Sequence, residues 1–321
     1  MMVRPNHGNT TKAGIVQLRP PTPALIETLD PRFRPLIHAH ARLEHLHAGS
    51  RWAEGPAYLP AHRVLYWSDI PGDRVLRYSE ADGTVAVHQT PCGYANGHTV
   101  DGEGRLVRCE HGGRCVSRTG HDGRREVLAS HWDGKRLNSP NDVVVARDGA
   151  VWFTDPTYGI DSDYEGERAA SEIGGSWVYR AVPGGPPVPV VTSMVKPNGL
   201  AFSPDERLLY VVDTGATHAP DGPRHMRRFA VGSDGTLSGG EVFATCEAGL
   251  FDGIRCDTAG HVWASANDGV HCYHPDGTRI GRIGVPEVVA NLCFGGPKRN
   301  RLYVCATTSL YAITVNANGA V

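Results

Sequence analysis

The sequence of 321 residues predicts an all-β protein, a six-bladed β-propeller, on the basis of three observations. First, 39 Gly and 23 Pro are distributed along the whole chain, which indicates many tight turns between short strands. Second, no stretch has the pattern of an amphipathic helix of about 10–15 residues, so alternating strands and helices are disfavoured. Third, one motif recurs six times at a spacing typical of propeller blades.

The recurring motif is a pair of strands that starts from a polar side chain. Each copy has one acidic or amide residue, an apolar strand of about four residues, a turn built on Gly, Asp or Pro, and a second strand rich in Val, Tyr, Trp and Leu. Successive copies are 39 to 57 residues apart, which accommodates four short strands and their turns. The six copies begin at Glu54, Asn96, Asn141, Asn198, Asp252 and Asn291.

The segments between these copies supply the outer strands of each blade. Only three strands follow the last copy, so ring closure requires a fourth strand from ARLEHLHAG (41–49), just before the first blade. We therefore divide the chain into a propeller domain, residues 36–321, and an N-terminal extension, residues 1–35, which is packed on one face or partly disordered. Further strands are predicted at 175–183, 226–232, 269–275 and 309–315.

Composition disfavours several classes of protein. The 32 Lys and Arg against 34 Asp and Glu give a net charge of −2, without the basic excess typical of nucleic-acid binding. Mean hydropathy is −0.30, and no run approaches the ~18 apolar residues of a membrane span. The start of the chain lacks the apolar core of a secretory signal, so a cytoplasmic location is expected. The eight Cys contain no C-x-x-C pair and are expected to be buried thiols.

The polar residue that opens each copy is the candidate functional group. Because the innermost strands of a propeller surround its central channel, residues at matched positions are expected to form one ring. Four amides and two carboxylates buried together are unfavourable without partners, and a divalent metal in the central channel satisfies them. We expect Ca²⁺ first, with Mg²⁺, Mn²⁺ or Zn²⁺ as alternatives. In the competing interpretation, each Asx side chain caps its own turn and binds no metal.

Six motifs in order connect this chain with a known family: RWAEGP (51–56), NSPNDVVV (138–145), WFTDPTYG (152–159), KPNGLAFSPD (196–205), LYVVDT (209–214) and FDGIRCDTAGHVW (251–263). Over roughly residues 36–315 the sequence resembles the gluconolactonase, regucalcin (senescence marker protein) and luciferin-regenerating-enzyme family. The resemblance implies a six-bladed propeller with a divalent metal in its channel. It also implies that the metal ligands are Glu54, Asn141, Asn198 and Asp252, while Asn96 and Asn291 lie at the site without assigned coordination.

The expected chemistry is hydrolysis of a lactone. A metal in this ring keeps positions open for water and for a substrate oxygen, and it can polarise a carbonyl. The predicted function is metal-dependent conversion of a sugar lactone, such as gluconolactone, to the aldonic acid. Asp252 is the predicted general base that takes a proton from water; it is alternatively a structural ligand, or a nucleophile that attacks the lactone.

Other residues near the ring are candidates for binding the lactone. The Arg136 guanidinium could reach hydroxyls or a carboxylate of a sugar acid, whereas animal members of the family carry an Arg at the position of Ser139. The longest insertion, 157–177, is predicted to be a mobile lid or, alternatively, a solvated loop. His111 could carry a proton or serve packing, and Asp155 could carry a proton or form a turn. The predicted substrate-binding residues are Asn96, His111, Arg136, Asp155 and Asn291.

Two alternative functions are compatible with the same ring. The cation could polarise a P=O group, which would make the protein a phosphotriesterase-like or other ester hydrolase. The ring could instead belong to a non-catalytic calcium-binding scaffold. The absence of G-x-S-x-G, H-E-x-x-H and G-x-x-x-x-G-K-[ST] disfavours serine hydrolases, zincins and nucleotide hydrolases. The expected partner is a small-molecule lactone, with no nucleic acid and no membrane, and no oligomeric state is predicted.

Overall fold

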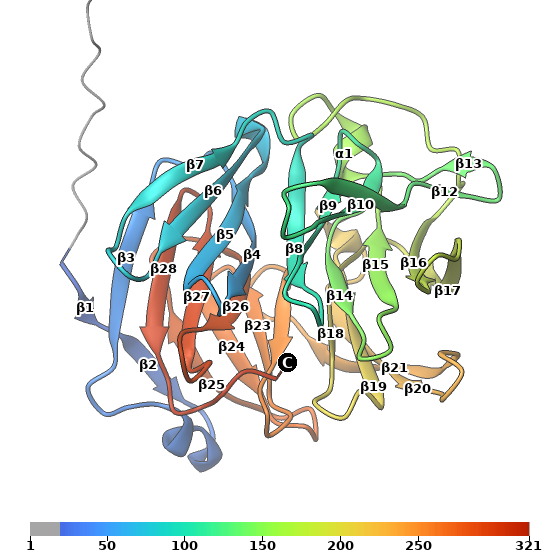
Figure 1. Cartoon of the computed structure of the whole chain (residues 1–321). Coiled ribbons are helices and arrows are strands. Elements are labelled where there is room, and N and C mark those ends of the chain that lie inside the picture. Colours follow the sequence, from blue (N-terminus) through green and yellow to red (C-terminus); the bar gives the residue numbers. More distant parts are fainter. Residues whose placement is uncertain (1–19, 321) are drawn as a thin grey trace, which may run out of the picture.

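The computed structural model describes residues 20–320 and contains six sheets of four or five antiparallel strands, together with a short hairpin. The six sheets are arranged as blades around a central channel (Figure 1). Each innermost strand begins within two residues of one of the six polar residues predicted to open the blades. The predicted all-β, six-bladed propeller is therefore confirmed.

The strands of the six blades fall into four positions from the channel outward. The inner strands are β4 (Ala53–Leu59), β8 (Ala95–Val100), β14 (Val143–Val145), β18 (Pro197–Phe202), β22 (Ile254–Cys256) and β26 (Val289–Gly295). The second strands are β5 (Val64–Asp69), β9 (Leu106–Glu110), β15 (Val151–Asp155), β19 (Leu208–Asp213), β23 (Val262–Ala266) and β27 (Arg301–Ala306). The third strands are β6 (Arg74–Ser79), β10 (Cys115–Thr119), β16 (Ser176–Ala181), β20 (His225–Val231), β24 (Gly269–Tyr273) and β28 (Ser309–Thr314). The fourth strands are β7 (Val85–Gln89), β11 (Arg125–Ala129), β17 (Pro187–Met194), β21 (Leu237–Thr245), β25 (Arg279–Gly284) and β3 (Arg42–Ala48).

Strand β3 closes the ring. It pairs antiparallel with β28, so the strand that precedes the first blade completes the last one, as predicted for residues 41–49. Two further strands, β1 (Thr22–Pro23) and β2 (Leu25–Thr28), extend the sixth and fifth blades at their outer edges. Residues 20–35 of the predicted extension thus lie along two blade edges, and residues 1–19 lie outside the described part of the chain.

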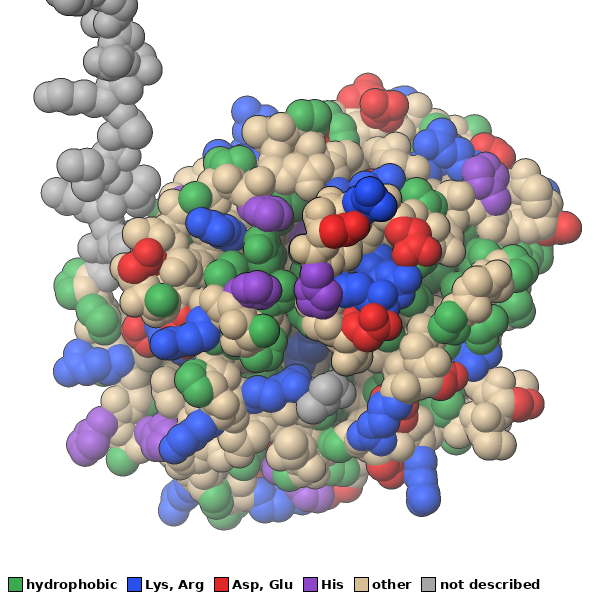
Figure 2. Space-filling model, in the orientation of Figure 1, with side chains coloured by type: hydrophobic (Ala, Val, Ile, Leu, Met, Phe, Trp, Pro, Cys, Tyr) green, Lys and Arg blue, Asp and Glu red, His purple; other side chains and the backbone are tan. Residues whose placement is uncertain are grey.

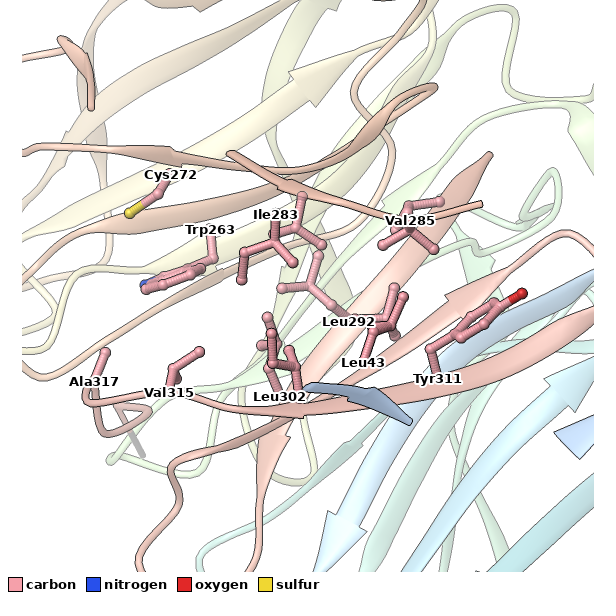
Figure 3. Close-up of a cluster of buried hydrophobic side chains, with 14 of the residues drawn as sticks. Leu43, Trp263, Cys272, Ile283, Val285, Leu292, Leu302, Tyr311, Val315 and Ala317 are labelled. Atoms are coloured by element: carbon pink, nitrogen blue, oxygen red, sulfur yellow. The ribbon is translucent and has the colours of Figure 1, made fainter. Parts of the chain in front are cut away.

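The fifth and sixth blades share a hydrophobic core. Figure 3 shows Trp263 of the fifth blade and Leu292 of the sixth in this cluster. Phe33, from the 3₁₀ helix η1 (Pro31–Leu36), is fully buried in the same cluster and lies 6.1 Å from Trp263 between ring centroids. A Cβ at Gly281 would lie 2.0 Å from the Phe33 ring, so only glycine fits there. Burial of one such aromatic side chain contributes about 1.5–3 kcal/mol and ties the N-terminal segment to the propeller.

We call the polar residue that opens each blade its ring residue. In four blades a glycine follows the ring residue and lets neighbouring inner strands approach closely. The N–H of Gly199 donates to the carbonyl oxygen of Asp252, the ring residue of the next blade, at 3.1 Å. A Cβ at Gly199 would lie 2.0 Å from that oxygen, and one at Gly55 would lie 2.0 Å from the carbonyl oxygen of Asn96. Contact between the inner strands at the ring therefore requires glycine. The four glycines are Gly55, Gly97, Gly199 and Gly253.

The elements outside the blades are short. Besides η1, they are the hairpin of β12 (His131–Trp132) and β13 (Lys135–Arg136), the helix α1 (Tyr158–Asp161), and the 3₁₀ turns η2 (Ile70–Gly72) and η3 (Gly215–Thr217). No helix within residues 20–320 is both long and apolar enough to cross a membrane. All eight cysteines are buried and free, as the sequence predicts.

Replacement of Gly199 should test how closely the inner strands must approach. In Gly199→Ala the new methyl group meets a backbone oxygen that cannot move independently, so we expect a loss of about 1–3 kcal/mol in the free energy of unfolding. The matched control is Gly102→Ala, because a Cβ there meets no atom within 4 Å. Urea denaturation of both variants measures the difference. Equal stability of Gly199→Ala and the wild type would contradict this account of the ring.

Candidate functional site

A cavity of about 800 Å³ lies at the end of the channel where the inner strands begin. Its walls include the ring residues of the first five blades, Glu54, Asn96, Asn141, Asn198 and Asp252. The sixth ring residue, Asn291, is buried beside them. Its Nδ2 donates to Oε2 of Glu54 at 3.0 Å, and its Oδ1 accepts from the N–H of Leu292 at 2.8 Å. The fold therefore brings the ring together, and the Asn291 amide is engaged within the protein, where it holds Glu54.

The ring contains two carboxylates whose charges are not neutralised by Lys or Arg in the described part of the chain. Burial raises the pKa of Glu54 well above its ordinary range, and the nearby charges of Asp252 and Asp142 raise it further. Burial likewise raises the pKa of Asp252, to which the charges of Asp142 and Glu165 add. A hydrogen bond from Asn198 opposes this rise. The site is therefore strongly attractive to a cation.

The donor atoms of the ring fit a hard divalent cation. Carboxylate and amide oxygens are the ligands that Ca²⁺ and Mg²⁺ prefer, and a cation would offset the cost of burying two carboxylates. Residues 20–320 contain no group of three or more His, Cys, Asp or Glu side chains placed to hold a metal, so Asn oxygens are needed to complete a ligand set. The four residues predicted as metal ligands, Glu54, Asn141, Asn198 and Asp252, all line the cavity, as does Asn96.

An aspartate repeated in three blades holds the segment that leads into the ring residue. Asp69, at the end of β5, accepts the backbone N–H groups three and two residues before the ring residue of its blade, at 2.8 and 3.2 Å. Asp155, at the end of β15, accepts the two equivalent N–H groups at 2.9 Å each. Asp213, at the end of β19, does the same, again at 2.9 Å. These carboxylates position the ring residues by fixing the backbone that precedes them.

Of the five residues predicted to bind substrate, only Asn96 lines the cavity; His111, Arg136, Asp155 and Asn291 do not. Asp155 is fully buried, its pKa is raised to about 7 by that burial, and its oxygens are used by the backbone N–H groups described above. Arg136 lies in the exposed hairpin, where its backbone N–H donates to the Glu172 carboxylate at 2.9 Å and its Nη2 donates to the Gly113 carbonyl oxygen at 3.3 Å. Neither side chain reaches the cavity wall.

His111 connects the ring to the loop that borders the cavity. The His111 imidazole is fully buried, with Nε2 3.1 Å from Nδ2 of Asn96 and Nδ1 3.0 Å from the carbonyl oxygen of Glu165. Because a carbonyl oxygen only accepts, Nδ1 donates to it, and Nε2 accepts from Asn96. Burial lowers the pKa of His111 to about 4, so the imidazole is neutral at pH 7. His111 therefore fixes the amide of Asn96 rather than supplying a charge.

Residues 157–177, the predicted lid or loop, form one wall of the cavity. The contributing residues are Tyr158, Asp161, Ser162, Tyr164 and Glu165. Burial raises the pKa of Glu165 to about 7. Lys196, which the sequence analysis did not select, also lines the cavity; its Nζ donates to Asp161 at 2.7 Å and lies 4.8 Å from the centre of the Tyr158 ring. Its position two residues before Asn198 is the signal that could have identified it.

Comparisons with known proteins show the family to which this chain is related. The model of the SMP-30/gluconolactonase/LRE-like region matches residues 52–308. A gluconolactonase of Zymomonas mobilis is 29% identical over 313 residues, covering 92% of this chain and 87% of that protein. A pentonolactonase of Haloferax volcanii is 32% identical over 265 residues, covering 79% and 81%. The solved structure of a gluconolactonase of Xanthomonas campestris is 38% identical, with a TM-score of 0.86 and coverage of 94% and 99%. The chain therefore belongs to the SMP-30/gluconolactonase/LRE-like family.

Proposed function

We propose that this protein is a metal-dependent lactonase that hydrolyses a sugar lactone of the gluconolactone type to its aldonic acid. The relatives named gluconolactonase and pentonolactonase support lactone hydrolysis. The observation that carries the metal requirement is the pair of buried carboxylates, Glu54 and Asp252, which face a cavity with the amides of Asn141 and Asn198 and have no cationic partner among the described residues.

These four residues would hold the metal, and Ca²⁺ is the proposed ion because all the donors are oxygen atoms. When bound, a divalent cation supplies Lewis-acid polarisation of a carbonyl and lowers the pKa of neighbouring water. Mg²⁺, Mn²⁺ and Zn²⁺ remain chemically acceptable in the same donor set. The protein supplies the ring that fixes the donors and the cavity that admits the lactone.

Asp252 is the proposed general base. Its carboxylate lines the cavity and is oriented by the hydrogen bond from Asn198. As the oxygen of a water molecule bonds to the lactone carbonyl carbon, Asp252 takes one proton from that water. The bond between the carbonyl carbon and the ring oxygen then breaks, and Asp252 returns the proton to the ring oxygen. The product is the open-chain hydroxy acid, and Asp252 regains its starting state.

The cavity wall offers groups suited to sugar hydroxyls. Lys196 supplies a cation and donor that Asp161 holds in place, and Glu165 supplies an acceptor from residues 157–177. Asn96 is fixed on one side by His111. We assign substrate orientation to Lys196, Glu165 and Asn96, because hydrogen bonds to charged groups contribute roughly 1.5–3 kcal/mol each. Hydroxylated lactones are therefore favoured over unsubstituted ones.

The purified, metal-loaded protein is expected to open gluconolactone faster than buffer in a pH-indicator assay. Chelation should abolish the acceleration, and Ca²⁺, Mg²⁺, Mn²⁺ or Zn²⁺ should restore it, because the carbonyl is polarised only by the bound ion. Phosphotriesters measured in parallel test the ester-hydrolase alternative, which a higher kcat/KM on those substrates would favour. Failure to accelerate any five- or six-membered lactone with metal bound would favour the non-catalytic scaffold.

Asp252→Asn is expected to lower kcat for lactone opening about 100-fold or more, because the amide cannot accept the proton from water. Asp234→Asn, at an exposed turn, is the matched control and should retain wild-type kcat. Metal content measured for both variants separates loss of the base from loss of the ion. A kcat within threefold of wild type at equal metal content would contradict the role of Asp252.

Lys196→Met is expected to raise KM for gluconolactone about tenfold with a smaller change in kcat, because one charged hydrogen bond to the substrate is lost. Lys135→Met, on the exposed hairpin, is the control for removing a positive charge. Steady-state kinetics on gluconolactone and on an unsubstituted lactone measure both constants. An equal effect on the two lactones would argue against recognition of hydroxyl groups by Lys196.

A further inference from the structure

A second cavity lies at the opposite end of the channel. It measures about 360 Å³, and its walls come from residues at or near the ends of the same inner strands whose beginnings form the ring. None of its residues lines the first cavity. The last described residue, Ala320, borders it, and Figure 1 marks the C-terminal end of the chain near the middle of the ring. We call this space the distal cavity.

Two guanidinium groups face the distal cavity with few partners. Arg255 donates from Nη1 to the carbonyl oxygen of Ile254 at 2.7 Å and lies 3.4 Å from Oδ2 of Asp142, but its Nη2 is buried without a hydrogen-bond partner. Arg299 donates to the carbonyl oxygen of Ala320 and makes no salt bridge with any described residue. Burial lowers the pKa of Arg299, as expected for a cation without a neighbouring carboxylate.

The carboxylates that border the distal cavity are committed elsewhere. Asp101 pairs with Arg105 at 2.8 Å, and Glu206 accepts from the backbone N–H of Arg147 at 3.1 Å. Glu206 also forms a salt bridge with Arg147. Within residues 20–320, the charged side chain on the cavity wall that has no ionic partner is therefore Arg299. Figure 2 shows this face of the molecule, with Lys and Arg side chains (blue) in and beside the hollow near its middle. Arg255 has Asp142 as a counter-charge at 3.4 Å, whereas Arg299 has none among the described residues. Burying a cation without a counter-charge is unfavourable, and an anion would relieve that cost.

His98 adds a second requirement. It is fully buried on β8 and borders the same cavity, with Nδ1 2.9 Å from the carbonyl oxygen of Gly55. Because that oxygen only accepts, Nδ1 carries the proton, and Nε2 is a buried acceptor without a partner. Burial lowers the pKa of His98 to about 3, so the imidazole does not gain a second proton at pH 7. A ligand that satisfies Nε2 must bring its own O–H group.

We propose that the distal cavity is a binding site for a small oxyanion that also carries a hydroxyl group, with Arg255 and Arg299 binding the charged oxygens and His98 accepting from the hydroxyl. Inorganic phosphate and small hydroxycarboxylates share this chemistry. The site uses no residue assigned to lactone hydrolysis, so it is independent of the proposed catalytic function.

Calorimetric titration of the metal-loaded protein with inorganic phosphate tests the proposal. The wild type is expected to bind with a dissociation constant of about 1 mM or tighter. Arg299→Gln should weaken binding at least tenfold while lactone hydrolysis is retained. Arg207→Gln, an 85% exposed arginine in the turn at the same end of the molecule, is the matched control and should bind as the wild type does. Binding that is insensitive to Arg299→Gln would overturn the proposal.

A second variant covers the case in which Arg299→Gln does not fold. Thr99→Asp places a carboxylate on the wall of the distal cavity without removing the Arg299 contact to Ala320, and it should abolish phosphate binding by neutralising the guanidinium groups. Glycolate and acetate distinguish the ligand classes: glycolate should bind and acetate should bind at least tenfold more weakly, because acetate has no hydroxyl for His98. Equal binding of the two, or unaltered phosphate binding by Thr99→Asp, would contradict the assignment.

Discussion

The close approach of the six inner strands at one end of the channel is the constraint on which the rest of the structure depends. Where the strands begin, backbone atoms of neighbouring blades are in contact, and a Cβ on Gly55 or Gly199 would clash with a carbonyl oxygen of the next blade at 2.0 Å. The contact brings six polar residues from six blades into one ring. Pairing of β3 with β28 then closes the circle of blades, because it joins the segment before the first blade to the last blade.

The convergence has an electrostatic consequence along the channel. At one end, Glu54 and Asp252 are buried without Lys or Arg partners among the described residues, and this is the reason we propose a cation site there. At the other end, Arg255 and Arg299 border a cavity whose own carboxylates are paired elsewhere. Asp142 lies between the two, 3.4 Å from Arg255 and close enough to Glu54 to raise its pKa. The two proposed sites, one for a cation and one for an anion, therefore lie at opposite ends of one channel.

The fold and the ring are predictable from sequence because both repeat. A polar residue at the start of each inner strand recurs at blade spacing, and the missing strand of the last blade can be inferred from ring closure. The role of Asp155 is less accessible: its match with Asp213 at the ends of two second strands is visible in the sequence, but which N–H groups they hold depends on the folded turns. Glu165 lies in a long insertion that has no counterpart in other blades, so no repeat identifies it, and Lys196 is marked only by its position two residues before Asn198.

The central claim is that carboxylate and amide oxygens of four blades hold one divalent cation. Crystals grown with Mn²⁺ and measured near its absorption edge would locate the ion directly through its anomalous scattering. The account predicts one strong peak among Glu54, Asn141, Asn198 and Asp252, absent from crystals of a Glu54→Gln, Asp252→Asn double variant. No peak in the ring of the wild-type protein, or a peak that the double variant retains, would contradict it.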